Sequence, residues 1–212
     1  MFGIENLWLF VLSGFLLNVL PGPDSLYVIS RSAAQGFRAG SVAAFGIGSG
    51  IMVHVLAAAF GLSAILATSA TAFTVVKLVG CAYLVYMGLS LLFARPRPTT
   101  TETVLVRKND SLRRVYSKGF LTNVLNPKVA LFFLAFVPQF IAVDAPSKAL
   151  AFVLLGLIFN LNGMVWCHFL AWSASSISAR FNQSARLSRG LNRLAGVLFA
   201  WFGVSLALSE QN

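Results

Sequence analysis

Charged residues are scarce in this chain of 212 residues: they make up 10% of it, against about 25% in soluble globular proteins. Only 2 cysteines are present, too few for a secreted disulfide scaffold. Apolar residues make up 58% of the chain and include 19 phenylalanines, which excludes intrinsic disorder. A soluble fold with a mean hydropathy of +0.80 would expose large apolar patches, which monomeric soluble proteins rarely do. The composition therefore predicts an integral membrane protein.

Long stretches without charge predict an all-α membrane fold with six spanning helices, because one span needs about 20 mostly apolar residues. We expect these helices at residues 6–29, 39–62, 72–93, 116–137, 149–173 and 191–208. Pro138 should end the fourth of them. The chain between the third and fourth helices is rich in proline, threonine and charge, which is typical of a flexible linker.

Basic residues gather in three of the predicted connections, which indicates how the chain is oriented. The sequence has 16 lysines and arginines, and most of them follow the first, third or fifth helix. Arg31 and Arg38, for example, fall in the connection after the first helix. By the positive-inside rule these connections are cytoplasmic, and both termini lie outside the cytoplasm. The net charge of +10 is therefore a topology signal, and not the solvated basic face of a nucleic-acid-binding domain.

The two halves of the chain share a short sequence repeat. Residues 14–20 read GFLLNVL and residues 119–125 read GFLTNVL. With three spans in each half, the two copies enter the membrane from opposite sides, which is the inverted 3+3 architecture of secondary transporters. The sequence thus predicts a first three-helix repeat at 1–93, a cytoplasmic linker at 94–115 and a second three-helix repeat at 116–212.

Prolines follow both copies of the repeat and are expected to break the first and fourth helices near the middle of the membrane. Pro21, Pro23 and Pro127 each remove a backbone donor, so carbonyls one turn earlier, such as that of Leu17, lose their usual partners. Gly22 relaxes the backbone further. Interrupted helices in corresponding positions of two halves point to the substrate site of a transporter. A simple packing kink at each proline is the alternative.

Two charged residues, Asp24 and Lys128, lie deep in the predicted spans, each directly after one of the breaks. Ionisable residues inside a membrane are costly and usually mark function. Lys128 is too far from the cytoplasmic boundary to reach it, and we expect Asp24 to be its partner. Two structural alternatives stay open: Asp24 as the N-cap of a half-helix, and Lys128 in a purely structural pair or carbonyl contact.

An amino acid is a zwitterion, and the predicted site offers groups for both of its ends. Lys128, with backbone donors at the starts of the half-helices, would bind the carboxylate. Asp24 and the freed carbonyls would bind the ammonium, and nearby asparagines offer donors and acceptors. The expected substrate-binding residues are Asp24, Lys128, Asn18, Pro21, Gly22, Pro23, Asn123, Asn126, Pro127 and Asn160. For Asn160, and for the neighbouring Asn162, hydrogen bonding between helices is an equal alternative.

Other conspicuous residues are expected to be structural. His54 and His168 lie singly in different helices, which is a poor arrangement for a metal site, so we expect them to form core hydrogen bonds. Gly46 and Gly50 have the spacing of closely packed membrane helices. Lys77 lies near the end of the third helix and is expected to extend its ammonium to the membrane surface.

Several motifs, distributed over nearly the whole chain, occur together in one known family. They are Pro21-Gly22-Pro23, Gly36, Gly40, Gly46, Gly50 and Gly61-Leu62, Lys77-x-x-Gly80-x-x-Tyr83-Leu84-x-Tyr86-x-Gly88, Gly119-Phe120-x-x-Asn123-x-x-Asn126-Pro127-Lys128 and Phe136-Val137-Pro138-Gln139-Phe140. In these motifs the chain resembles the LysE/RhtB family of amino-acid exporters. The resemblance implies export from the bacterial cytoplasm, and it leaves the substrate open among lysine, threonine, homoserine, leucine and cysteine-pathway compounds.

We therefore expect a multi-pass transporter of the bacterial inner membrane, and not an enzyme. It would export amino acids or close derivatives by alternating access, without a cofactor or metal, with the bilayer and its substrate as partners. Proton coupling through Asp24 and a homo-oligomeric state both stay open. One alternative is a transporter of another small solute or a cation, which the few membrane carboxylates and the central lysine disfavour. The other is a membrane thiol-redox enzyme using Cys81 and Cys167, although free buried thiols are the simpler expectation.

Overall fold

The computed structural model describes residues 3–64, 110–142 and 144–176, together with single positions between 71 and 93 and between 197 and 204. Apart from one β-bridge, between Ile4 and Ile141, the regular structure of these described residues is helical. The predicted all-α class is therefore confirmed.

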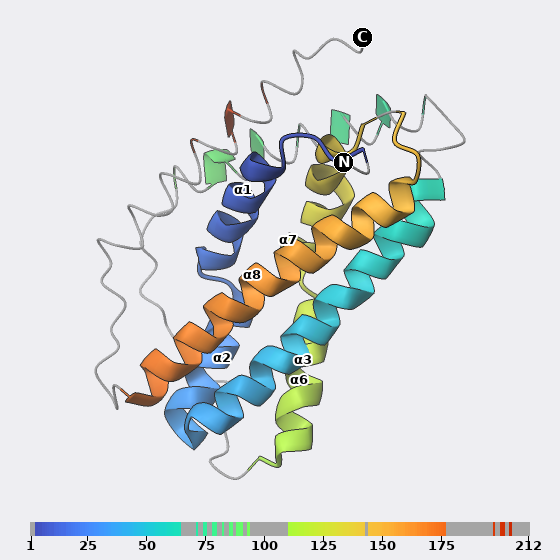
Figure 1. Ribbon diagram of the computed structural model, residues 1–212. Coiled ribbons are helices and arrows are strands. Elements are labelled where there is room, and N and C mark those ends of the chain that lie inside the picture. The colour runs from blue at the N-terminus through green and yellow to red at the C-terminus, as the bar shows by residue number, and fades with distance from the viewer. Residues whose placement is uncertain are drawn as a thin grey trace.

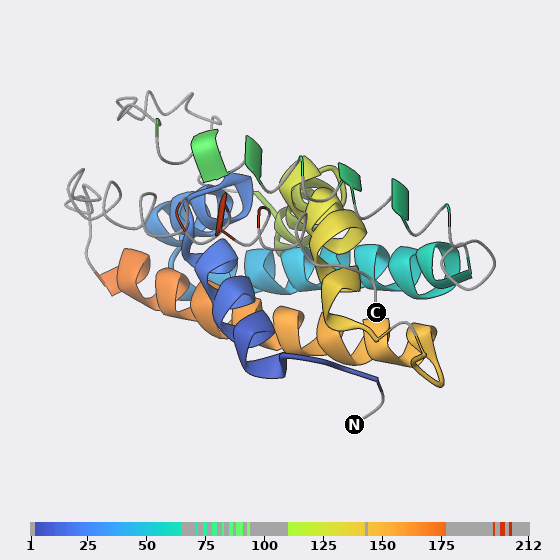
Figure 2. The same ribbon diagram turned by 90° about the horizontal axis from the view of Figure 1, so that it is seen from above.

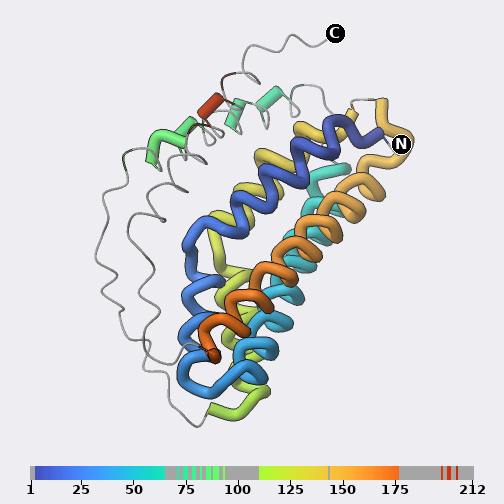
Figure 3. The backbone as a smooth tube through the Cα atoms, turned by 60° about the vertical axis from the view of Figure 1, so that its left-hand side comes forward, coloured from blue at the N-terminus to red at the C-terminus, as the bar shows by residue number. Residues whose placement is uncertain are grey.

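The first predicted span is a broken helix. Helix α1 covers Leu7–Val19 and α2 covers Pro23–Gln35, and the two are bent by 53° relative to each other (Figure 3). Gly22 has an extended backbone, and Pro23 stands in the first turn of α2, where a missing N–H costs little. The expected break is confirmed, and the second part continues beyond the predicted end at residue 29.

The fourth predicted span is broken in the same way, with a bend of 46°. Asn126 caps the second part, because its side chain accepts a hydrogen bond from the backbone N–H of Lys128. Pro138 does not end the helix as predicted: it lies in the first turn of a 3-10 segment, where proline is tolerated. The parts are α6, Leu112–Val124; α7, Pro127–Leu131; the π-helical η2, Phe132–Phe136; and the 3-10 helix η3, Val137–Phe140.

Two long helices pack against the broken ones. Helix α3 covers Phe37–Leu56 and continues as the π-helical η1, Ala57–Leu62, and α8 covers Lys148–Ser176. Figures 1 and 2 show α3 between α6 and α8. By length and composition, the described residues contain two candidate membrane spans, or up to four if each bent pair is one span. Outside the described residues lie Lys77, Cys81, half of the predicted helix at 72–93 and most of the predicted helix at 191–208.

Helices α3 and α6 touch each other through glycines. Gly46 faces the backbone of Tyr116, and a Cβ atom added to Gly50 would lie 2.8 Å from the Cβ atom of Asn123. Gly119, on α6, faces the backbone of α3 in return. No larger residue fits at these positions without a shift of the backbone, so the predicted packing role of Gly46 and Gly50 is confirmed.

Aromatic side chains fill the part of the core between α1, η2 and α8. The ring centroids of Phe132 and Phe159 are 4.5 Å apart, and Phe10 packs on Phe132 at 6.0 Å. All three side chains are buried. Because stacked aromatic rings pack densely, this cluster joins α1, η2 and α8 into one core.

Four charged side chains join the end of α2 to the start of α6: Arg31, Asp110, Arg114 and Lys118, here called the Asp110 cluster. Arg31 Nη2 lies 2.7 Å from Asp110 Oδ2, and Arg114 and Lys118 approach the same carboxylate at 3.2 and 3.3 Å. The hydrogen bond from Arg31 is the main reason why the pKa of Asp110 falls to about 2. The prediction that Arg31 lies in a connection is wrong: it is buried within α2, where Asp110 compensates its charge.

Candidate functional site

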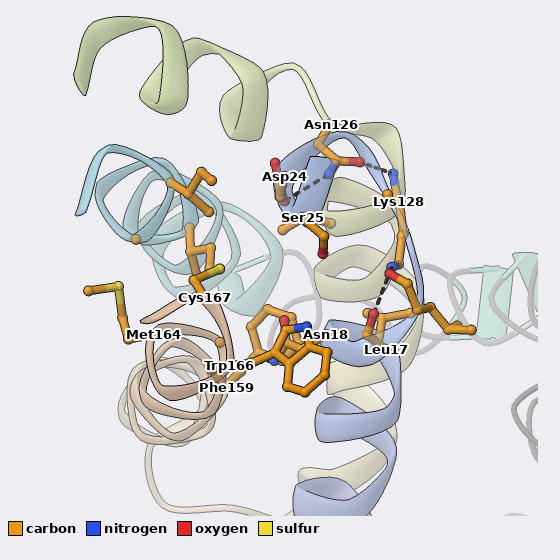
Figure 4. Close-up of a pocket in the computed structure, with 17 residues that line it drawn as sticks. Leu17, Asn18, Asp24, Ser25, Asn126, Lys128, Phe159, Met164, Trp166 and Cys167 are labelled. Atoms are coloured by element: carbon orange, nitrogen blue, oxygen red, sulfur yellow. Dashed lines mark hydrogen bonds between the residues drawn. The ribbon is translucent and has the colours of Figure 1, made fainter. Parts of the chain in front are cut away.

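A pocket lies where the two helix breaks face the middle of α3 and α8 (Figure 4). The space between its lining residues is about 510 Å³, including the open space at its mouth. Of the ten predicted substrate-binding residues, the pocket is lined by Asn18, Gly22, Asp24, Asn126 and Lys128. The other five, which do not line it, are Pro21, Pro23, Asn123, Pro127 and Asn160.

The ammonium of Lys128 binds backbone carbonyls at the first helix break. Its Nζ atom donates to Leu17 O at 2.6 Å and to Leu20 O at 3.2 Å. As predicted, the carbonyl of Leu17 has no helical partner. It accepts a hydrogen bond from Lys128, which lies in the other half of the sequence. The end of α1 also carries the negative end of the helix dipole, which favours a cation there.

The expected direct pairing of Lys128 with Asp24 is not found, although both residues lie in the described part of the chain. The Asp24 carboxylate instead accepts two hydrogen bonds through its Oδ2 atom, from Asn123 Nδ2 at 2.9 Å and from Asn126 Nδ2 at 3.0 Å. Asp24 is not the N-cap of α2 either, because Gly22 occupies that position. The carboxylate lies in the first turn of α2, where the helix dipole favours a negative charge.

One oxygen of Asp24 has no hydrogen-bond partner among the described residues. The Oδ1 atom is buried in the wall of the pocket, where neither Asn123 nor Asn126 reaches it. A carboxylate oxygen that no protein group reaches can accept a hydrogen bond from a group inside the pocket. The arrangement therefore leaves a position for one donor group inside the pocket.

Asn126 connects the two charged residues that do not touch each other. Its Nδ2 atom donates to Asp24, while its Oδ1 atom accepts from the backbone N–H of Lys128 at 3.0 Å. The same side chain therefore caps α7 and holds the carboxylate of α2 against it (Figure 4). The sequence predicts Asn126 as a site residue, but it gives no sign of this double contact.

His54 supports the site from α3, a role that the sequence analysis missed. Its Nε2 atom lies 3.1 Å from Asn123 O, the carbonyl next to the second break, and Asn123 in turn donates to Asp24. The predicted core hydrogen bonding of the histidines is confirmed, since His168 also contacts a backbone carbonyl at 2.8 Å, that of Met164. A lone histidine in an apolar helix carries no sequence signal for such a position.

The remaining predicted asparagines connect helices. Asn18 Nδ2 lies 3.5 Å from Phe159 O, and Asn160 Nδ2 donates to Gly48 O at 3.3 Å. Asn160 thus joins α8 to α3 and does not line the pocket. This is the hydrogen bonding between helices that the sequence left open as an alternative to substrate binding. Asn162 has a buried Nδ2 atom without a partner among the described residues.

The wall opposite the charged residues is mostly apolar, and the sequence does not predict it. It comes from α3 and α8, and includes Ile47, Ile51, Met164 and Cys167. Cys167 is a buried free thiol, as expected. Apolar residues in apolar helices carry no sequence signal that separates pocket walls from lipid-facing or core positions. The described residues include no group of three or more histidine, cysteine, aspartate or glutamate side chains that could hold a metal.

Comparison with known proteins gives one family over almost the whole chain. The family described as LysE type translocator matches residues 15–210. An uncharacterized membrane protein of Pseudomonas aeruginosa is 32% identical over 211 residues, which are 97% of this chain and 96% of that protein. The leucine efflux protein of Salmonella typhimurium is 27% identical over 97% of this chain and 96% of its own length. That of an Enterobacter species is 28% identical over 97% of both chains. No solved structure matches the chain.

Proposed function

The chain belongs to the LysE type translocator family, and from this premise we propose that it exports amino acids or their close derivatives across the bacterial inner membrane. Two of the similar proteins named above are leucine efflux proteins, and they match over nearly their full length. Membership in a family of translocators disfavours the thiol-redox alternative with Cys81 and Cys167. The observation that carries the proposal is the pocket, which holds an unsatisfied carboxylate oxygen and a lysine ammonium at two breaks in apolar helices.

The pocket suits a zwitterion because it has complementary groups for both charges. The substrate ammonium would donate to Asp24 Oδ1, the buried oxygen that has no other donor among the described residues. The substrate carboxylate would bind the ammonium of Lys128 in a charge-assisted hydrogen bond. Asn18 lines the same pocket and offers a further donor and acceptor.

We expect the substrate carboxylate to draw the Lys128 ammonium away from its present partners. Its Nζ atom bonds the carbonyls of Leu17 and Leu20 at the end of α1. When Nζ turns to the substrate carboxylate, these carbonyls become free to accept from the substrate ammonium. The direct contact between Lys128 of α7 and the end of α1 is then lost, and the substrate connects the two helices instead. Binding of the substrate would therefore change how the two broken helices are held relative to each other. Alternating access needs a link of this kind.

The buried oxygen of Asp24 also gives a reason for proton coupling. The substrate ammonium and a proton on the carboxylate would both occupy this position, and they cannot do so at the same time. Because both compete for one atom, binding of the substrate at the cytoplasmic side releases the proton, and release of the substrate outside allows a proton to bind. The result is export of the amino acid in exchange for a proton.

We place this site in a membrane fold of six spans, with two inverted three-helix repeats, a cytoplasmic linker that begins after residue 93 and ends before α6 at Leu112, and both termini outside. Support comes from the two broken helices, which occupy corresponding places in the two halves and contribute to one pocket. A reporter that is active only outside the cytoplasm should be active when fused after Leu208 and silent when fused near Val106. The opposite pair of results contradicts this orientation.

Transport by purified protein in liposomes tests the proposed function. With labelled leucine and a panel of other amino acids, we expect efflux driven by an imposed pH gradient. Asp24→Asn and Lys128→Met should abolish it, whereas Asp144→Asn, a change in an exposed turn, should transport like the wild type. Replacing both Pro21 and Pro23 with alanine should restore a continuous helix and abolish transport as well. If the wild type moves no amino acid, the proposed function is wrong.

A further inference from the structure

Trp166, on α8, brings a hydrogen-bond donor into the pocket that the contacts of Asp24 and Lys128 leave unused. Its side chain lines the pocket. Its Nε1 atom is buried, and no acceptor among the described residues reaches it. An indole N–H group that no protein acceptor reaches can donate a hydrogen bond to a group inside the pocket.

Two aromatic neighbours hold the indole of Trp166 in place. The ring meets that of Phe15 on α1 edge to face, with centroids 6.2 Å apart and an interplanar angle of 79°. It stacks on the ring of Phe169, one turn further along α8, at 5.5 Å. Neither phenylalanine has a nitrogen or oxygen atom in its side chain, so these contacts orient the indole without using its N–H group.

Trp166 and Lys128 both approach the last turns of α1, one from α8 and the other from α7. Helix α8 comes close to α1 at Gly163, one turn before Trp166, where an added Cβ atom would lie 3.3 Å from Asn18 Oδ1. Asn18 directly follows Leu17, whose carbonyl accepts from Lys128 Nζ at 2.6 Å. Figure 4 shows Trp166 and Asn18 at one end of the pocket. A neutral donor and a charged donor are therefore found at the same end of α1.

The chemistry of an amino acid decides which of its groups can pair with this indole. An indole N–H group only donates, and an ammonium group also only donates, so the two cannot bond to each other. The carboxylate is the acceptor that all amino acids share, and it has one oxygen for Lys128 and a second for another donor. We propose that Trp166 is a substrate-binding residue, whose indole N–H group donates to the carboxylate of the bound amino acid. With its ammonium on Asp24 Oδ1, the substrate then connects α2 to α8, whichever side chain it carries.

This inference rests on the proposed export function and adds a residue that recognises the substrate carboxylate. Magnetic resonance of the full chain in detergent, with isotope-labelled indole nitrogen atoms, observes the N–H group directly. The chain has 4 tryptophans, and the signal of Trp166 is the one that disappears in Trp166→Phe. Leucine should move this signal downfield and slow the exchange of its proton with solvent. Isoamylamine, which is leucine without its carboxylate, should do neither.

The indole signal and the export assay fail separately. A Trp166 signal that leucine leaves unchanged, or that isoamylamine moves equally, overturns the inference. If the wild type nevertheless exports leucine, the proposed function stands without Trp166. A shift with leucine alone supports the carboxylate contact even in a protein that exports nothing, and only the proposed function is then wrong.

Trp166→Phe tests the same contact by removing the N–H group while keeping an aromatic ring against Phe15 and Phe169. The leucine concentration that gives half-maximal export should rise about tenfold or more, because a hydrogen bond to a charged group is lost. The affinity for isoamylamine, measured by thermal stabilisation in detergent, should not change. Trp172→Phe is the matched control, since Trp172 lies on the same helix, is exposed and does not line the pocket. Unchanged half-maximal export in Trp166→Phe, or an equal loss of affinity for leucine and isoamylamine, would show that the inference is wrong.

Discussion

Replacing Asn126 with alanine removes two hydrogen bonds of different kinds at once. The first caps α7, and loss of an N-cap costs about 0.5–2 kcal/mol. The second donates to the carboxylate of Asp24, and hydrogen bonds to charged groups contribute about 1.5–3 kcal/mol. Asn126→Ala should therefore lower the free energy of unfolding by about 2–5 kcal/mol. At roughly 2–4 °C per kcal/mol for a chain of this length, the melting temperature in detergent should fall by about 4–20 °C.

A second variant separates the two contacts of Asn126. Serine is also a good N-cap residue, but its side chain is too short to cap α7 and reach Asp24 at the same time. Asn126→Ser should recover the part of the stability that belongs to the cap. Export by Asn126→Ala and by Asn126→Ser should both be lower than that of the wild type. In both variants the Asp24 carboxylate keeps only its hydrogen bond from Asn123 and is no longer held at the second helix break. Thermal unfolding in detergent and leucine efflux from liposomes measure the two effects independently.

The control for this pair is Asn162→Ala on α8, which removes an amide whose Nδ2 atom has no partner among the described residues. Its stability should be unchanged or slightly higher, because a buried unsatisfied donor is lost. If Asn126→Ala melts at the same temperature as Asn162→Ala, the two bonds do not contribute to stability. If Asn126→Ser exports at the wild-type rate, the contact with Asp24 is not needed for transport.

Two further predictions concern the helix contact and the charged cluster. Gly50→Ala forces a Cβ atom to 2.8 Å from Asn123 Cβ and should cost about 1–3 kcal/mol. At Gly61 an added Cβ atom meets nothing within 4 Å, so equal melting temperatures for Gly50→Ala and Gly61→Ala would contradict the tight contact. The pKa of Asp110 is lowered from 3.8 to about 2, chiefly by Arg31, so its stabilising contribution is complete above about pH 4 and is lost as the pH falls towards about 2. Unfolding measured across this range should show the loss in the wild type and not in Asp110→Asn; identical curves would refute it.

The helix breaks could be predicted from the sequence because their cause is local. Proline removes a donor wherever it stands, so Pro21, Pro23 and Pro127 predict both breaks, and the repeat shows that they correspond. The freed carbonyl of Leu17 follows from the same covalent fact. These features need no knowledge of which helices are neighbours.

The partners of the charged residues could not be predicted, because they depend on packing. Opposite charges make Asp24 and Lys128 the expected pair from the sequence. In the structure, backbone carbonyls are closer to Lys128, and two asparagine amides are closer to Asp24. The sequence assigns Arg31 to a connection because its partner, Asp110, lies far along the chain, in a segment with the composition of a linker. For the apolar wall, the residues differ in no chemical respect from those that face lipid.

The glycine contact between α3 and α6 has a consequence for how the protein is made. Gly46 and Gly50 lie in the first half of the chain, and the backbone they touch lies in the second half, beyond the linker. Because synthesis proceeds from the N-terminus, α3 enters the bilayer with its glycine face uncovered and stays so until α6 arrives. A chain that ends before α6 would therefore leave this glycine face without its partner helix.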